Sequence, residues 1–333
     1  MNHRITLEGG GVFDVSAEED TLLRGALRAG IGFPHDCSVG GCGNCRFDLV
    51  SGEMENLWPE APGLSERDRR RGKRLACQSR ALGDCTIRIR PSEEYRPIVR
   101  PRLMRAVLKR RAPITSDISE FVFTTDVPAK FLAGQYALLY PPGTIGARAY
   151  SMSNLPNADG EWHFVIRRVP GGRGSSAVFD RLNIGDAIPV DGPYGHAWFR
   201  ENEPRDVVCI AGGSGVGPVV SIVRATLASP VRPRIRVFEG ARTRSDLSVP
   251  TLLGDALADL DAYTPVLSAE AEGGDWTGAR GFVHEELERA LADRYDTSEF
   301  YFAGPPAMIE AVQSLLVMRW SVPLNRIHYD RFF

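Results

Sequence analysis

The sequence predicts a multidomain chain: a small β-rich module, an antiparallel β-barrel domain, and an α/β domain built on a parallel sheet. Three observations support this prediction. The length of 333 residues exceeds that of one ordinary domain. Short strand-like segments separated by turn residues fill residues 102–200, and strands alternate with helices after about residue 203. We therefore predict domains at 1–95, 96–202 and 203–333.

The first module has one clear amphipathic helix near Asp20–Ala29, where leucines and alanines form an apolar stripe. A second, basic helix is expected after Ser65, with Asp68 completing a capping box. The segment Pro91–Pro101 is polar and contains three prolines, which is typical of a linker. The strands predicted in this module are Arg4–Leu7, Val12–Val15, Arg46–Val50 and Thr86–Arg90.

Four of the six cysteines have an informative spacing. Cys37, Cys42, Cys45 and Cys77 follow C-x4-C-x2-C, then thirty-one residues, then C, which is the plant-type [2Fe–2S] ligand spacing. Glycines between the first three let a loop wrap closely round a cluster, so that backbone N–H groups reach its sulfur atoms. Zinc is the alternative, but zinc ribbons use two CxxC pairs and only one occurs here. Cys85 and Cys209 fall outside the pattern, and we expect both to be small core residues.

The barrel segment carries groups that suit a flavin. In Arg148-Ala149-Tyr150-Ser151 a cation can meet a phosphate, a ring can stack on the isoalloxazine, and a hydroxyl can bond N5. Arg167 and the run from Gly171 to Ser176, with Gly172 and Ser175, supply a second phosphate-friendly loop before a helix predicted at Ser176–Leu182. A simple hairpin turn is the alternative for this glycine run.

The α/β domain opens with the strand VVCIAGG, which runs into a glycine loop and a helix at Pro218–Leu227. Glycines there let a pyrophosphate approach the helix N-terminus, although a glycine loop alone is weak evidence. After the strand IRVFEGA, Glu239 could accept from a ribose hydroxyl, whereas Arg242 and Arg244 could favour a 2′-phosphate. The loop consists of Gly212, Gly213, Ser214, Gly215, Val216, Gly217 and Pro218. The other elements predicted are helices at Val249–Leu260, Val283–Ala292 and Ala307–Arg319, and strands YTPVLSA, EFYFAGP and IHYDRFF.

Composition and charge argue against several functions. The net charge of −2 favours neither nucleic acid nor a membrane surface as a partner, and no run of eighteen apolar residues occurs. The N-terminal segment resembles a strand rather than a secretion signal, so we expect a cytoplasmic protein. Residues 1–66 hold eleven acidic and four basic residues, and a basic run follows at 67–74. This asymmetry indicates either a solvated helix or patches that steer a redox partner. The scattered histidines, His328 among them, are expected to be structural.

The RxYS motif, the GGSGxGP loop and the later Gly304-Pro305-Pro306 together resemble the ferredoxin–NADP⁺ reductase superfamily. With the N-terminal cysteine module, the order ferredoxin, flavin, nicotinamide is similar to the NADH-dependent reductase components of bacterial multicomponent aromatic oxygenases. NLWPEAPGL (56–64) and IHYDRFF (327–333) resemble toluene monooxygenase reductases, and VPGGR and GPYG resemble naphthalene-type dioxygenase reductases.

The resemblance implies a β-grasp [2Fe–2S] ferredoxin domain, an FAD-binding β-barrel and an NAD-binding α/β domain. It further implies that Arg148 contacts a flavin phosphate, Tyr150 stacks on the flavin and Ser151 bonds N5. By the same resemblance Arg167, Gly172 and Ser175 bind the diphosphate. Residues 212–218, Glu239, Arg242, Gly304 and Pro305 are expected at the nicotinamide cofactor, and Phe332 and Phe333 at the flavin face. The family usually has cysteine where this chain has Ala303, which puts the rate of hydride transfer in doubt rather than the reaction.

The function implied is that of an NADH:acceptor oxidoreductase, with hydride passing from NADH to FAD and single electrons passing through the [2Fe–2S] cluster. The expected partner is an oxygenase component or a Rieske ferredoxin, and the chain is expected to be a monomer. The alternatives are a stand-alone reductase of another acceptor and a non-catalytic redox-sensing iron–sulfur protein.

Overall fold

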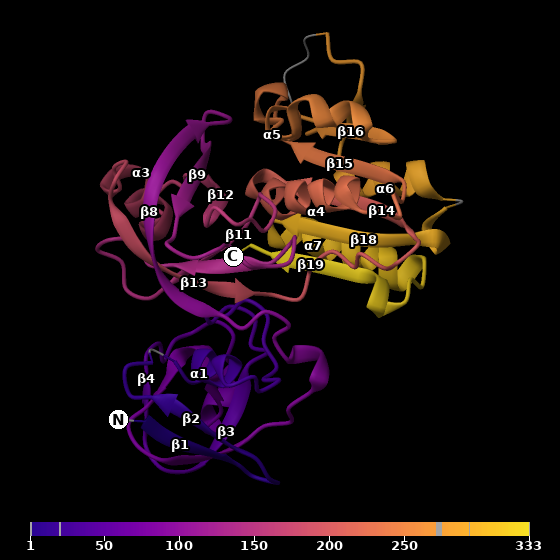
Figure 1. The fold of residues 1–333 in the computed structure, drawn as a ribbon. Helices are drawn as coiled ribbons and strands as arrows, with labels where there is room; N and C mark the ends of the chain where they lie inside the picture. The colour runs from indigo at the N-terminus through magenta and orange to yellow at the C-terminus, as the bar shows by residue number, and fades with distance from the viewer. Residues whose placement is uncertain (1, 20, 271–274, 293, 333) are drawn as a thin grey trace. The chain divides into compact units, whose positions relative to one another are not determined.

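The computed structural model describes residues 2–19, 21–270, 275–292 and 294–332. They form two compact units, drawn in Figure 1. The smaller unit contains the residues up to Leu103, together with the short segments Ala147–Ala149 and Asp191–His196. The larger unit contains the remaining residues and includes both most of the barrel and the parallel sheet. No helix among the described residues is both long and apolar enough to cross a membrane.

The smaller unit is built on a five-stranded mixed sheet in the order β2-β1-β7-β3-β5. Strand β1 pairs antiparallel with β2 and parallel with β7, which gives the β-grasp arrangement. The four strands predicted in this module are confirmed. The strands are β1 (Asn2–Leu7), β2 (Val12–Ser16), β3 (Arg46–Ser51), β4 (Met54–Asn56), β5 (Arg74–Leu75), β6 (Ser79–Ala81) and β7 (Cys85–Arg88).

The two predicted helices of this unit are present, and the second has the cap expected at Ser65. Helix α1 (Leu22–Arg28) is capped by Thr21, and its leucines are fully buried because they fall on the apolar stripe. Asp20, where the helix was expected to begin, lies outside the described residues. Helix α2 (Glu66–Arg70) starts at Ser65, whose hydroxyl oxygen accepts from the Asp68 N–H at 3.1 Å. None of the residues of α2 is buried, as expected for a solvated basic helix.

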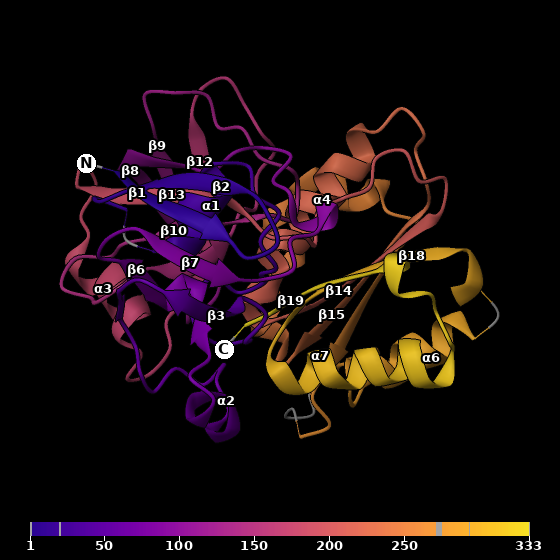
Figure 2. The same ribbon diagram turned by 90° about the horizontal axis from the view of Figure 1, so that it is seen from below.

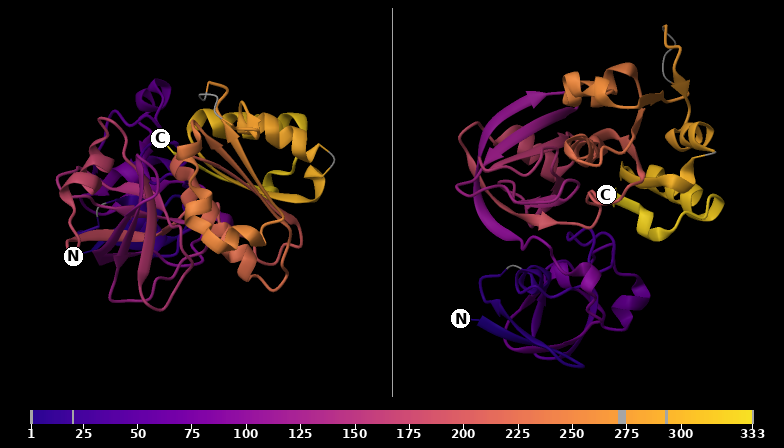
Figure 3. Two further views of the ribbon diagram at one scale, coloured as in Figure 1. Left: turned by 90° about the horizontal axis from the view of Figure 1, so that it is seen from above. Right: turned by 45° about the vertical axis from the view of Figure 1, so that its right-hand side comes forward.

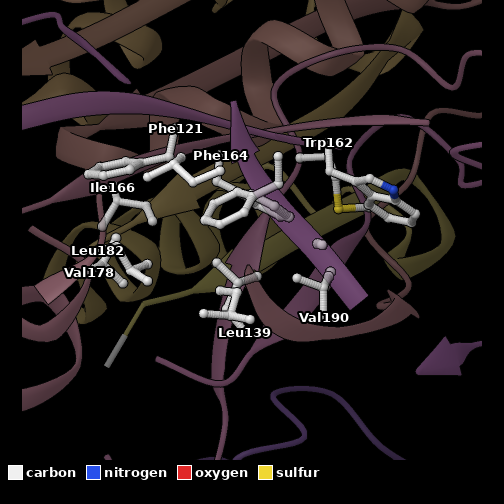
Figure 4. Close-up of a cluster of buried hydrophobic side chains, with 14 of the residues drawn as sticks. Phe121, Leu139, Trp162, Phe164, Ile166, Val178, Leu182 and Val190 are labelled. Atoms are coloured by element: carbon white, nitrogen blue, oxygen red, sulfur yellow. The ribbon is translucent and has the colours of Figure 1, made fainter. Parts of the chain in front are cut away.

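Six strands form the antiparallel barrel in the order β11-β10-β13-β8-β9-β12. A bridge between Met152 and Phe164 joins the two ends of this order. The core inside is aromatic and aliphatic, with Phe121, Trp162 and Phe164 almost inaccessible to solvent (Figure 4). The elements are β8 (Arg102–Pro113), β9 (Ile118–Thr124), β10 (Tyr136–Leu139), β11 (Arg148–Ser151), β12 (Glu161–Arg167), α3 (Arg173–Arg181) and β13 (Ala187–Tyr194).

The parallel sheet has the order β17-β16-β15-β14-β18-β19, and each pair of neighbouring strands is parallel. Alternate residues of β14 face opposite sides: Cys209 packs with α4 and α5, and Ile210 with α6 and α7. Figures 2 and 3 show α6 and α7 on the face opposite α4. The elements are β14 (Asp206–Gly212), α4 (Val216–Ala228), β15 (Ile235–Ala241), α5 (Val249–Leu253), β16 (Ala262–Leu267), β17 (Ala279–Arg280), α6 (Val283–Leu291), β18 (Ser298–Gly304), α7 (Pro306–Gln313) and β19 (Ile327–Arg331).

Several predicted boundaries were wrong. The helix expected at Val249–Leu260 ends at Leu253, because Gly254 takes a positive φ of 55° and a 3₁₀ segment follows. Helix α7 changes to a π-helical turn at Ser314–Arg319. Helix α3 begins at Arg173, three residues before the predicted start. The short strands β4, β5, β6 and β17 were not predicted, because two or three residues carry no periodicity.

Candidate functional site

The four cysteines of the spacing pattern come together as two pairs of thiols. The Sγ atoms of Cys45 and Cys77 lie 3.3 Å apart, and both side chains are buried. The Cys37 and Cys42 thiols are hydrogen-bonded to each other, and both residues are partly exposed. The fourth cysteine joins the loop because the Ala76 N–H donates to the Cys45 carbonyl oxygen at 2.9 Å.

Backbone N–H groups of the loop point at its sulfur atoms. The Cys37 Sγ accepts from the N–H groups of Gly41 and Cys42 at 3.2 and 3.3 Å, and the Cys42 Sγ accepts from Asn44 at 3.4 Å. The hydrogen bond from the Cys42 thiol, helped by these N–H groups, lowers the pKa of the Cys37 thiol to about 6. The same hydrogen bond raises the pKa of the Cys42 thiol, so this pair favours thiolate at Cys37, and thiolate is the form that binds metal.

The loop conformation requires its glycines. Gly40 and Gly43 have positive φ angles of 90° and 81°. A Cβ on Gly43 would lie 2.4 Å from the Gly63 carbonyl oxygen, so a larger residue would push the two loop segments apart. The Gly63 N–H in turn donates to the Gly40 carbonyl oxygen at 2.9 Å, which joins residues 57–64 to the cysteine loop.

The thiol pairs fit a two-iron cluster better than a zinc ion. In a [2Fe–2S] cluster each iron takes two thiolates, whereas a structural zinc site needs four ligands around one point. Across the described ranges, no group of three or more His, Cys, Asp or Glu side chains is arranged to hold a single metal ion. Cys37 and Cys42 would hold one iron, and Cys45 and Cys77 the other.

The structure places the flavin motif on β11. Ser151 is buried, with 6% of its surface exposed, and its hydroxyl donates to Asp330 Oδ2 at 3.3 Å. Tyr150 is half-buried and packs against the barrel core, so its ring is held in place. Arg148 is half-buried, and its Nη1 donates to the carbonyl oxygen of Ala147 at 2.9 Å.

The second predicted phosphate loop leads into α3 as expected. Gly172 is the N-cap residue of this nine-residue helix, so the N–H groups of the first turn have no intrahelical partner. Ser175 Oγ accepts from the Val169 N–H at 3.1 Å and fixes the loop. Arg167 lies close by in sequence but forms an ion pair with Asp117 at 2.8 Å.

The glycine loop after β14 meets the loop after β18 at the carboxyl end of the sheet. Gly213 has a positive φ of 56°, and the chain passes through a 3₁₀ turn into α4. A Cβ on Gly215 would lie 2.0 Å from the Ala303 carbonyl oxygen, and one on Gly304 2.7 Å from Met308 Cε. Glycine lets the two loops come this close to each other. Backbone rather than side chains therefore lines this edge of the sheet, which is where α/β sheets bind nucleotides.

The structure brings these loops next to the flavin motif. A Cβ on Gly217 would lie 3.7 Å from the Ser151 carbonyl oxygen, and one on Gly213 would lie 3.7 Å from Arg167 Nη1. Phe332 is half-buried, and its N–H donates to the Gly304 carbonyl oxygen at 3.0 Å. Pro305 is exposed as the N-cap residue of α7. Phe333 lies outside the described residues.

Glu239 and Arg242 are both engaged inside the protein. Glu239 is 2% exposed, and its carboxylate accepts from the Ser248 N–H and hydroxyl at 2.7 Å and from the Tyr263 hydroxyl at 2.5 Å. Arg242 bridges Asp117 and Asp246 at 3.1 and 3.0 Å. Ribose binding by Glu239 stays a prediction, and it would require the carboxylate to leave this network.

Asp330 was missed by the sequence analysis. It lies on β19, is 9% exposed, and pairs in register with Ala303 of β18. The only sequence signal was its place in the final strand IHYDRFF, of which only the two phenylalanines were expected at the flavin.

Comparison with known proteins identifies the parts of the chain. Residues 5–82 match the 2Fe-2S iron-sulfur cluster binding domain, residues 105–199 the oxidoreductase FAD-binding domain, and residues 209–314 the oxidoreductase NAD-binding domain. The ferredoxin–NAD(P)⁺ reductase CarAd of Metapseudomonas resinovorans is 40% identical over 319 residues, covering 94% of each chain. The chain belongs to the ferredoxin–NAD(P)⁺ reductase family. This family membership confirms the resemblance, the fold class and the three cofactors [2Fe–2S], FAD and NAD.

Solved reductases of this family have the same fold. The ferredoxin reductase in carbazole 1,9a-dioxygenase is 35% identical, with a TM-score of 0.93 over 100% of this chain and 99% of that chain. The Amycolatopsis cytochrome P450 reductase GcoB is 29% identical, with a TM-score of 0.82 over 99% of this chain and 98% of that one. Reductases of the two systems named from the sequence, xylene/toluene monooxygenase and naphthalene 1,2-dioxygenase, are 32% and 34% identical.

Proposed function

We propose that this reductase delivers electrons from NADH to the oxygenase component of a multicomponent aromatic mono- or dioxygenase, or to a Rieske ferredoxin serving one. The observation that carries the proposal is the occurrence of [2Fe–2S], FAD and NAD domains in one chain whose length matches oxygenase reductases. The cofactors supply the chemistry: FAD accepts hydride from NADH, and the [2Fe–2S] cluster passes on one electron at a time.

The chain's own residues bind and orient these groups. With FAD bound, Ser151 would present its hydroxyl to flavin N5 and Tyr150 would stack on the ring. The phosphates would be held by Arg148, Arg167, Gly172 and Ser175. Residues 212–218 and 304–305 would leave room for the nicotinamide cofactor, and Glu239 and Arg242 would lie on the side of its ribose. Phe332 and Phe333 would cover the flavin. The buried Ser151–Asp330 pair supports this arrangement, because the hydrogen bond to Asp330 gives the Ser151 hydroxyl a fixed partner.

The proposal includes domain limits of 1–95, 96–202 and 203–333, a preference for NADH, and a single chain working in the cytoplasm. The experiment is reconstitution. The purified holoenzyme, NADH and the oxygenase and ferredoxin components encoded near its gene should turn over an aromatic substrate. Omission of the reductase should stop turnover. NADH oxidation with an artificial acceptor, but none with these components, would contradict the oxygenase assignment.

A stand-alone reductase of another acceptor is the second candidate, favoured by the likeness to the cytochrome P450 reductase GcoB. A P450 offered in the same assay separates the two. Faster reduction of the P450 haem than of the oxygenase or ferredoxin would support this second candidate.

A further inference from the structure

An exposed tryptophan lies on the loop that carries the cluster cysteines. Trp58 is 43% exposed, although tryptophan side chains are on average largely buried. A Cβ on Gly40 would lie 3.1 Å from Trp58 Cε3 and 3.3 Å from Gln78 Cγ, so both side chains meet the same side of the cysteine loop. Gln78 directly follows Cys77 in the chain. Part of the indole therefore contacts the loop that binds the cluster, while another part faces solvent.

The basic helix α2 is fastened to the same segment. The Ala61 N–H donates to the Trp58 carbonyl oxygen at 3.1 Å, and Arg69 Nη2 of α2 donates to the Ala61 carbonyl oxygen at 2.9 Å. Asp68 of α2 also pairs at 3.0 Å with Arg46, the residue that follows the third cysteine of the loop. Figure 2 shows α2 standing out from the strands of this unit. The helix is thus held beside both Trp58 and the cysteine loop.

The segment that contains Trp58 and α2 is basic, whereas the chain before it is acidic. Residues 58–74 hold six basic and three acidic side chains, and residues 1–57 hold four basic and nine acidic ones. Within the part of the chain that the structure describes, Arg67 and Arg71 are exposed and form no ion pair, so a partner can use their charges. An acidic protein would be attracted to this segment and repelled by the rest of the module, which would orient its approach.

The exposed groups of this segment are of the kinds that protein interfaces use. Trp58, Pro59 and Pro62 are exposed apolar residues beside the exposed arginines of α2. Tryptophan and arginine are enriched among the side chains that carry most of the binding energy of an interface. Transient electron-transfer complexes bury less than about 1,200 Å² in total, so one indole, two prolines and a short helix form a contact of suitable size.

We propose that Trp58, Arg67 and Arg71 form the docking surface for the one-electron acceptor, and that this acceptor is a protein with carboxylates around an apolar contact next to its own redox centre. The inference rests on the proposed function and names the chemistry of its partner. The arginines attract and orient the acceptor, and the indole supplies the apolar contact that keeps it against the cysteine loop. One electron leaves this chain in each encounter and reduces the acceptor by one, with no bond formed or broken.

The charge of the surface is tested with the purified holoenzyme and the acceptor component encoded beside its gene. Arg67→Glu places an acid in the first turn of α2, where it suits the helix dipole, so the helix should stay folded. The KM for the acceptor should rise about tenfold at low ionic strength and return toward the wild-type value at high salt, with kcat unchanged.

Arg4→Glu is the matched control for this measurement. Arg4 is an exposed arginine of β1, and β7 and β3 separate β1 from β5, the strand that follows α2. The control makes the same change in net charge and should leave the KM near the wild-type value. Equal effects of the two substitutions, or an Arg67→Glu effect that does not depend on salt, would overturn the proposal.

Cytochrome c, a cationic one-electron acceptor, gives the opposite expectation for the same variant. The arginines repel it, so Arg67→Glu should raise the cluster-dependent rate of its reduction several-fold at low salt, whereas Arg4→Glu should not. The cluster-dependent rate is the part that Cys77→Ser abolishes. An unchanged or lower rate in Arg67→Glu would overturn the proposal. Because this measurement needs no oxygenase component, a wild-type protein that fails to reduce those components would contradict only the proposed function.

Substitutions of Trp58 test the apolar contact. Trp58→Ala should raise the Kd for the acceptor component about five- to tenfold in calorimetric titration of the holoenzyme, and Trp58→Phe should restore most of the affinity. The visible spectrum and the midpoint potential of the cluster should remain those of wild type. Val12→Ala is the control, because Val12 is 55% exposed on β2, at the opposite end of the sheet from β5.

Three outcomes of the Trp58 experiment would overturn the docking role. The first is an unchanged Kd in Trp58→Ala, and the second is an equal loss of affinity in Val12→Ala. The third is loss of the cluster spectrum in Trp58→Ala, which would make the indole a structural support of the cysteine loop.

Discussion

Asp191 of β13 is fully buried, and Arg28 of helix α1 donates to its Oδ2 at 2.6 Å. Arg24 Nε lies 3.8 Å from the same oxygen, and the Tyr194 hydroxyl donates to it at 2.9 Å. One carboxylate thus contacts two arginines of α1, of which Arg28 also pairs with Glu19, and it ties the segment Asp191–His196 into the smaller unit.

Asp191→Asn should destabilise the protein strongly. Asparagine keeps the size of the side chain but removes the buried negative charge beside Arg24 and Arg28, although Arg28 keeps its pair with Glu19. Loss of one partner of a buried ion pair costs about 3–5 kcal/mol. Urea unfolding followed by circular dichroism measures the change. Glu66→Gln is the control, since its pair with Arg70 is exposed and should contribute under about 0.5 kcal/mol. Equal effects of the two substitutions would contradict the buried-pair interpretation.

Cys77→Ser should separate the two halves of the electron path. Loss of one thiolate of the buried pair should abolish the visible cluster spectrum and the reduction of protein acceptors. NADH oxidation by ferricyanide should remain, because it needs only the flavin. Cys85→Ser is the matched control, since Cys85 is buried in the same unit but lies outside both thiol pairs. If Cys77→Ser lost flavin reduction to the same extent, the order flavin then cluster would be wrong.

Glu239→Gln should reduce stability rather than change nucleotide preference. The carboxylate of Glu239 accepts hydrogen bonds from Ser248 and Tyr263. The NH₂ group of a glutamine cannot accept a hydrogen bond, so one of these buried donors is left unsatisfied. Such a loss costs about 1–3 kcal/mol of stability. Thermal unfolding measures the stability, and kcat/KM for NADH and NADPH measures the nucleotide preference. Asp255→Asn is the control, because Asp255 is exposed. Unchanged stability together with a lost NADH preference would instead support a contact with ribose.

Glu120 gives the barrel a stability that depends on acid pH. Burial raises the pKa of its carboxyl, but hydrogen bonds and charge from His163 and Arg110 outweigh burial and lower it to about 2. A carboxyl with a depressed pKa stabilises the fold above about pH 4.5 and loses this contribution as pH falls toward 2. The contribution of Glu120 to stability that is lost in acid amounts to about 2 kcal/mol after solvent screening.

Glu120→Gln should therefore lower the melting temperature at pH 6 and match wild type more closely near pH 3. Calorimetric scans across this range would show the gap between the two proteins narrowing with acid. Glu286→Gln, whose ion pair with Arg289 is largely exposed on the arginine side, should show a small, nearly constant gap. A Glu120→Gln gap that widened with acid would show that the sign of the pKa shift is wrong.

Local signals account for what could be predicted. The first three cysteines, the glycine loop and the RAYS segment each lie within a short stretch, so distance along the sequence indicates distance in space. The thiols come together as pairs, the glycine loop leads from β14 into α4, and RAYS forms β11. The long helices and buried strands were also predicted, because their apolar periodicity extends over seven or more residues. The two-residue strands and the π-helical end of α7 were not, since neither carries a repeating pattern.

The sequence by itself determined the kinds of group this protein uses: four thiols in a fixed spacing, a flavin motif and a nucleotide loop. Only the tertiary structure decided which residues meet across long sequence separations. It paired Ser151 with Asp330, 179 residues away, and enclosed Glu239 in a network with Tyr263. It also placed His328 in the lining of a small cavity rather than in the closely packed core. Such contacts follow from strand order and register in a folded sheet, and no spacing along the chain encodes them.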